Sequence, residues 1–194
     1  TDRLPPASAS PPQDAFPASW YHFISRSWSS GPRQRKTSSV RSPYGACVAH
    51  PQTPFHVYRA PLPLQTLARF GRWDEVLAEK APPREWLYTS GVWHYARGVA
   101  LNAKGQAADA AGELRALEAI LQSVPAERTT AFFFRTKNLL QLSANLLAGE
   151  IAAKAGDFTT AERLLRAAVA EQDSHWFTEP PPWYFPVRQA LGAV

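Results

Sequence analysis

Apolar residues recur at helical spacing from about residue 62 to the end of the chain. Ala- and Leu-rich stretches alternate there with short breaks at Gly or Pro, a pattern typical of amphipathic α-helices joined by tight turns. The spacing predicts helices over residues 64–70, 73–80, 85–104, 106–123, 127–155, 158–172 and 183–194. The expected fold class is therefore all-α, built from paired helices.

Three of the predicted turns carry a glycine at the same place, at Gly71, Gly105 and Gly156. Glycine accommodates the left-handed backbone that ends one helix before an antiparallel neighbour begins. Asp157 follows the third glycine and is well placed to cap the next helix. The recurring turn favours a repeated helix–turn–helix unit.

Two of the glycines inside predicted helices stand at matching positions. Gly98 and Gly149 stand seven residues before the second and third turn glycines. A glycine inside a helix costs about 1 kcal/mol relative to alanine, so a packing reason is expected. We expect another helix to approach closely at each position, with Ala110 and Ala161 as the matching small residues on the partner helices.

On these residues the chain resembles the tetratricopeptide repeat (TPR) family, whose unit is about 34 residues long. Gly71 and Gly105 are 34 residues apart, whereas Gly105 and Gly156 are 51 apart, so longer helices or insertions are required. The resemblance implies a right-handed α-solenoid over residues 61–194 that acts as a scaffold for another protein or peptide. Residues 178–188 also look like a segment of bacterial proteins of this class that have no assigned activity.

Composition changes near residue 60 and divides the chain into two predicted parts. Residues 1–60 hold ten Ser and nine Pro, and no acidic residue lies between positions 15 and 73, so the net charge of +5 comes from the front of the chain. Such a segment buries too little apolar surface to fold, and we expect residues 1–60 to be disordered. Two alternatives stay open: an arm that binds nucleic acid through the basic cluster at residues 33–36, or sequence that is not native coding sequence.

The chain shows no apolar run near 18 residues and no secretory signal pattern, so no membrane span is predicted. Cys47 is the single cysteine, which excludes an internal disulfide framework. We expect a cytoplasmic location. The chain has no methionine, and its last predicted helix has no partner, so we expect a fragment of a longer protein.

The sequence predicts no catalytic, cofactor-binding or metal-binding residue. His94 and His175 lack further ligands at metal-binding spacing, and Cys47 has no oriented base or nucleophile motif beside it. Carboxylates such as Glu113 and Glu150 are spaced as on solvated helix faces. An accessory domain of a larger enzyme stays open as an alternative function.

Two sets of residues are candidates for partner binding. The resemblance places Tyr95, Asn102, Glu150 and Gln189 on a concave face, with core packing as the alternative role for Tyr95. The aromatic loop over residues 175–185 supplies the second set, which consists of Trp176, Trp183 and Tyr184. These aromatic residues could form a hot spot for a partner or a plug that seals the helical stack.

Overall fold

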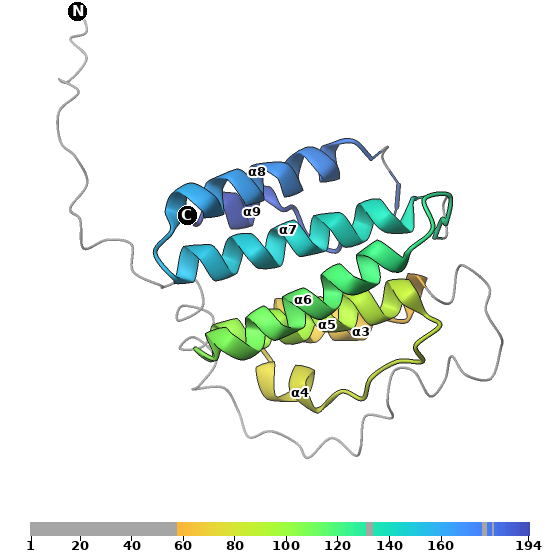
Figure 1. Cartoon of the computed structure of the whole chain (residues 1–194), viewed down its shortest axis with the longest axis horizontal. Coiled ribbons are helices and arrows are strands. Elements are labelled where there is room, and N and C mark those ends of the chain that lie inside the picture. The colour runs from red at the N-terminus through yellow and green to blue at the C-terminus, as the bar shows by residue number, and fades with distance from the viewer. Residues whose placement is uncertain (1–57, 131–133, 176–177, 180) are drawn as a thin grey trace, which may run out of the picture. The chain divides into compact units, whose positions relative to one another are not determined.

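The structure is a computed structural model that describes residues 58–130, 134–175, 178–179 and 181–194, all within one compact unit. These residues form seven helices and no named strand (Figure 1). The helices are α3 (Leu62–Arg69), α4 (Trp73–Ala78), α5 (Leu87–Ala103), α6 (Ala107–Ser123), α7 (Thr136–Lys154), α8 (Phe158–Asp173) and α9 (Arg188–Leu191). The all-α prediction is confirmed for the described part of the chain.

The helices pack in antiparallel pairs, in which α5 lies against α6 and α7 against α8. Helix α7 also contacts both α5 and α6, while the shorter α3 and α4 pack on each other and on α5. Helices α5 and α7 bury 12 of 17 and 9 of 19 residues, whereas α6 and α8 each bury only three. The first helix of each pair is therefore the inner one.

The three turn glycines adopt the left-handed backbone that the sequence predicts, with φ of 67° at Gly71, 82° at Gly105 and 81° at Gly156. After Gly105, the Gln106 N–H donates to the Leu101 carbonyl over 2.9 Å, and the same bond recurs after the other two glycines. This is the Schellman arrangement that closes a helix. The Asp157 carboxylate accepts a bond from the Thr160 N–H over 3.0 Å and caps α8, as predicted.

The internal glycines mark close helix contacts, although one partner was predicted wrongly. A Cβ at Gly149 would stand 2.7 Å from Leu165 Cγ and 3.4 Å from the Ala161 carbonyl oxygen, on the expected helix. A Cβ at Gly98 would instead meet Leu147 Cδ2 of α7 at 2.5 Å, and not Ala110 of α6. The pairing differs because α5 is buried against the next helix pair as well as against its own partner.

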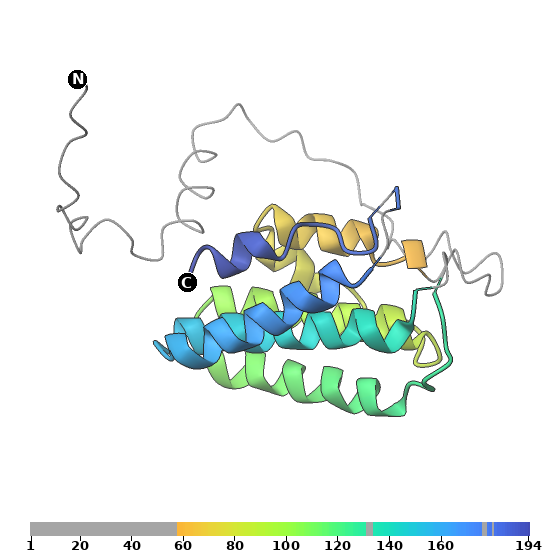
Figure 2. The same cartoon turned by 90° about the horizontal axis from the view of Figure 1, so that it is seen from above.

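Two predicted helices are shorter in the structure. The helix expected over residues 127–155 begins only at Thr136, because Thr129 and Arg135 form an isolated β-bridge and the Thr136 N–H donates to the Arg128 carbonyl over 2.9 Å. The helix expected over residues 183–194 is reduced to α9. Figure 2 shows the chain before α9 running without regular structure between α3 and α8.

Candidate functional site

The non-helical residues 181–187, called here the docked segment, bring three predicted partner-binding residues together. The Trp183 ring meets the Tyr95 ring edge-on, with centroids 5.2 Å apart. The hydroxyl groups of Tyr95 and Tyr184 are 3.2 Å apart and share a hydrogen bond. Trp183 and Tyr95 are each only 1% exposed. Tyr95 of the predicted concave set and the two aromatic residues of the predicted loop are therefore two sides of one contact.

Side chains of the helices hold the main chain of the docked segment. The Tyr58 hydroxyl donates to the Pro181 carbonyl over 3.0 Å. The Gln172 side chain, in the last turn of α8, donates to the Phe185 carbonyl over 2.9 Å and accepts from the Val187 N–H over 2.8 Å. Sequence reasoning missed Gln172, since a glutamine near a helix end carries no motif. We call Tyr58, Arg69, Tyr95, Glu150 and Gln172 the docking face.

Burial governs the protonation of the phenols at this contact. It raises the pKa of Tyr58 to about 12. Burial also raises the pKa of Tyr184, with a smaller rise from the negative charge of Glu150 and an opposing effect from the hydrogen bond with Tyr95. Both hydroxyl groups therefore stay protonated near neutral pH and can donate hydrogen bonds.

The docked segment is held at its edge by charged groups. The Arg69 guanidinium lies over the Phe185 ring, 5.9 Å from the centroid. Arg188, just beyond the segment, pairs with Asp173 through bonds of 2.6 and 2.5 Å on the exposed surface. Inside the contact, the Trp183 Nε1–H has no acceptor among the described residues. A buried donor without a partner costs about 1–3 kcal/mol.

The other predicted partner-binding residues have different surroundings. Asn102 is 7% exposed, and its side-chain NH₂ donates to the Glu150 carbonyl over 3.2 Å, so it joins α5 to α7 instead of facing a ligand. Glu150 is half-buried on α7, and Gln189 is exposed on α9. Trp176 lies outside the described residues. Tyr95 and Trp183 thus take the packing role that the sequence left open for them, and Asn102 fills a helix contact. Their part in partner binding stays a prediction.

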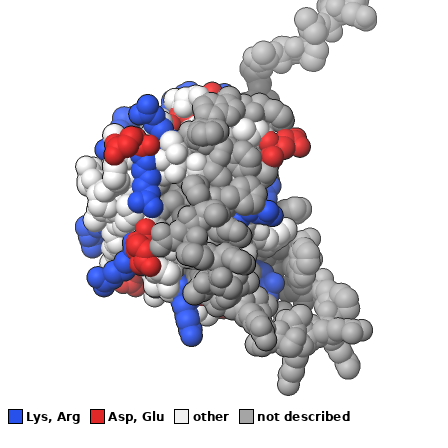
Figure 3. All heavy atoms as spheres, turned by 90° about the vertical axis from the view of Figure 1, so that its right-hand side faces the viewer, with Lys and Arg blue, Asp and Glu red and all other residues white. Residues whose placement is uncertain are grey.

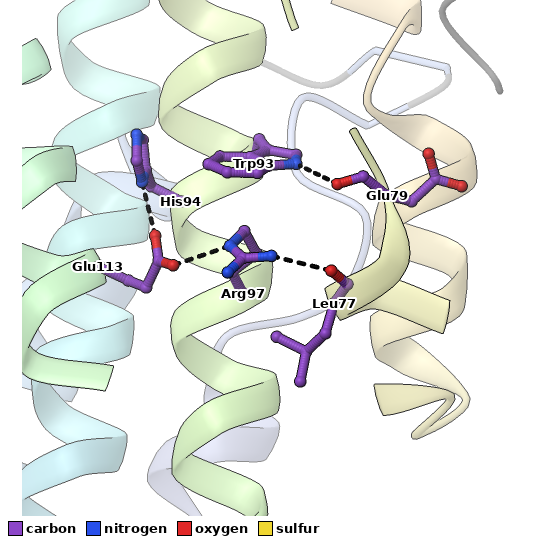
Figure 4. Close-up of polar contacts among 6 residues, drawn as sticks. All are labelled: Leu77, Glu79, Trp93, His94, Arg97 and Glu113. Atoms are coloured by element: carbon purple, nitrogen blue, oxygen red, sulfur yellow. Dashed lines mark hydrogen bonds and ion pairs between the residues drawn. The ribbon is translucent and has the colours of Figure 1, made fainter. Parts of the chain in front are cut away.

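A second polar cluster joins α4, α5 and α6 (Figure 4). Glu113 accepts a bond from Arg97 over 2.8 Å and shares one with His94 over 2.6 Å. Burial alone would raise the pKa of Glu113, but its bonds with His94 and Arg97 outweigh this effect and hold the pKa below its usual value. The Glu113 side chain is only 14% exposed. The expectation of a solvated glutamate at this position is therefore wrong.

The cluster also holds the end of α4. Arg97 donates to the Leu77 carbonyl over 3.0 Å, and the Trp93 indole N–H donates to the Glu79 carbonyl over 3.2 Å. Helix C-termini leave carbonyls without partners inside the helix, and these two bonds satisfy two of them. The Arg97 guanidinium also stacks on Trp93, 4.6 Å from the ring centroid. All these groups are engaged in holding three helices together.

Surface charge around the described helices is mixed. An open cavity of about 510 Å³ beside the Glu113 cluster is lined by two basic and two acidic side chains, Arg97, Arg115, Asp109 and Glu113. Figure 3 shows Lys and Arg interspersed with Asp and Glu on one face. Among the residues that the structure describes, no group of three potential metal ligands occurs. The basic cluster at residues 33–36 lies outside the described residues.

None of the described helices is long and apolar enough to cross a membrane. Comparisons with protein-family models, with curated proteins and with solved structures give no match. The resemblance to the tetratricopeptide repeat therefore stays a prediction that follows from the sequence.

Proposed function

We propose that residues 58–194 form a TPR-like α-solenoid module that binds a non-helical segment of another protein on the docking face, without catalysis of its own. The observation that carries this proposal is the docked segment itself. A non-helical stretch of chain already lies on this face and is held there by ring contacts and by hydrogen bonds to its main chain.

Contacts between successive turns support the repeat architecture. The Lys104 ammonium at the end of α5 pairs with Asp74 of α4 over 2.6 Å. The Lys154 ammonium at the end of α7 donates to the Ala103 carbonyl at the end of α5 over 2.9 Å. Each inner helix thus ends in a lysine that reaches the preceding helix pair. Lysines suit this place because helix C-termini carry partial negative charge.

The contacts of the docked segment are consistent with its replacement by a partner peptide. Its main chain forms no regular ladder with the described helices. The buried Trp183 Nε1–H, which has no acceptor among the residues that the structure describes, makes docking less favourable than complete pairing would. Trp183 and Val187 nevertheless bury almost all of their surface. An empty docking face would expose Tyr95 and its apolar neighbours to water, so the face requires an occupant from its own chain or from a partner.

The experiment uses the full chain with Trp183→Ala and Val187→Asp, called here the open variant. Loss of the buried indole should weaken docking by about 3–5 kcal/mol, and a carboxylate cannot be buried at position 187 without a partner. A labelled peptide of residues 178–188 is titrated into this variant and followed by fluorescence anisotropy. Saturable binding is expected, with a peptide of scrambled sequence as control. A helical open variant that binds neither peptide would refute the proposal.

A further inference from the structure

Gln172 makes two hydrogen bonds to the docked segment that together define a backbone clamp. Its Nε2–H donates to the carbonyl of Phe185, and its Oε1 accepts from the N–H of Val187. The assignment of nitrogen and oxygen follows from the partners, because a carbonyl only accepts and an N–H only donates. One planar amide thus fixes two main-chain groups that lie on either side of Pro186.

We propose that Gln172 binds the main chain of the partner on both sides of a proline, through the carbonyl before it and the N–H after it. The partner is then a non-helical, uncharged peptide with aromatic residues before that proline, which replaces the docked segment. This inference rests on the proposed function and specifies its ligand. Both bonds go to main-chain groups, so the clamp does not distinguish one side chain from another. Selectivity for the peptide sequence comes from the side-chain contacts on either side of the clamp.

Proline suits the central position for a chemical reason. It has no N–H to leave unpaired between the two clamped groups, and its fixed φ favours an extended backbone. Pro186 itself is exposed, whereas the next residue, Val187, is fully buried. The clamp therefore selects a proline that faces solvent, followed by a small apolar residue that does not.

The contacts before the proline define the aromatic part of the ligand. Phe185 lies under the Arg69 guanidinium, Tyr184 shares a hydrogen bond with the Tyr95 hydroxyl, and Trp183 packs edge-on against the Tyr95 ring. No charged residue occurs between positions 180 and 187. The peptide expected on the docking face therefore carries, in order, an indole, a phenol, a phenyl ring, a proline and a β-branched aliphatic residue.

A double-mutant cycle between the protein and the peptide tests the clamp. The 178–188 peptide is made with the normal amide or with an ester between Pro186 and Val187, which removes the Val187 N–H donor and also makes the Pro186 carbonyl a weaker acceptor. Each form is titrated into the open variant with Gln172 or with Gln172→Ala. The ester should weaken binding about tenfold, as expected for a hydrogen bond worth about 1.4 kcal/mol, and Gln172→Ala, which removes both bonds, should weaken it at least as much. The two changes together should weaken it little further.

Gln172→Glu is the matched control. Its carboxylate still accepts from the Val187 N–H but has no proton to donate to the Phe185 carbonyl, so binding should stay sensitive to the ester. Independent, additive effects of the ester and Gln172→Ala would overturn the clamp. Tight binding of the ester form would overturn it too, while the proposed function would stand. If the normal peptide fails to bind the folded open variant, the proposed function itself fails.

A second measurement keeps the inference testable if the open variant does not fold. In the otherwise unchanged chain, Gln172→Ala should speed amide hydrogen exchange at Val187 at least about tenfold, since local opening sets this exchange rate. Amides within α5 should keep their protection. Unchanged exchange at Val187 beside a protected α5 would overturn the clamp.

Discussion

Gly149 lies where α7 and α8 approach each other most closely, and replacing it with alanine tests that contact. Alanine is favoured over glycine inside a helix by about 1 kcal/mol, so propensity alone predicts a more stable protein. The added Cβ, however, would stand 2.7 Å from Leu165 Cγ and 2.9 Å from its Cδ2. Carbon atoms prefer separations of about 3.5–4.0 Å, so Leu165 or the helix must move.

The expected net effect of Gly149→Ala is destabilising. Leu165 is fully buried, and overpacking a dense core costs about 1–3 kcal/mol, which exceeds the gain in propensity. We expect a net loss of up to about 2 kcal/mol in the free energy of unfolding, measured by urea denaturation followed by circular dichroism. Gly112→Ala in α6 is the control, because its Cβ would meet only Arg115 Nη2, at 3.8 Å. This control should gain about 0.5–1 kcal/mol.

The double variant Gly149→Ala/Leu165→Ala tests whether steric overlap between the two side chains causes the loss of stability. If the two side chains collide, Leu165→Ala should cost at least about 1 kcal/mol less in the Gly149→Ala background than in the natural one. A stabilising Gly149→Ala, similar in size to Gly112→Ala, would refute the close approach of α7 and α8.

Three further changes probe the polar contacts. Glu113→Gln should lower the free energy of unfolding by about 1–3 kcal/mol at pH 7, because it weakens bonds to His94 and Arg97. Since the folded pKa of Glu113 is depressed, its stabilising effect is present above the usual pKa of 4.5 and is lost as the pH falls through the lower folded value. Urea titrations should therefore show the two proteins converging below pH 4.5, and a constant difference would contradict this account. Asp157→Ala should lower the thermal midpoint through loss of the α8 cap, with Asp157→Asn retaining most of it. Tyr95→Phe should increase amide exchange at residues 183–187 while leaving α6 protected, and unchanged exchange would show that the Tyr95–Tyr184 bond does not hold the segment.

Local chemistry explains which parts of the fold could be predicted. The turns at Gly71, Gly105 and Gly156 depend on a single residue that adopts positive φ, so the sequence alone reveals them. The partner of Gly98 depends on which helix lies opposite, and this is a property of the tertiary packing. The sequence predicted a helix that includes residues 183–187 because these residues are apolar. Their apolar character instead reflects burial of a non-helical chain against other helices.

The candidate site was predictable in its aromatic residues but not in its polar ones. Tyr95, Trp183 and Tyr184 stood out as large aromatic residues in or beside predicted helices, yet their mutual contact joins positions 88 or more residues apart. Gln172 lies in no motif, and its role arises only where the docked segment passes the end of α8. Glu113 likewise gains its partners from the neighbouring helix α5, which periodicity within α6 does not show.

Under the proposed function, the docking face binds a non-helical peptide, and residues 181–187 compete for this face. The most direct measurement compares the dissociation constant of the labelled 178–188 peptide for the intact chain and for the open variant. A tethered competitor has an effective concentration in the millimolar range, so we expect at least about tenfold weaker binding to the intact chain. Equal affinity for the two proteins would contradict the competition, and absence of binding to a folded open variant would contradict the docking face as a peptide site.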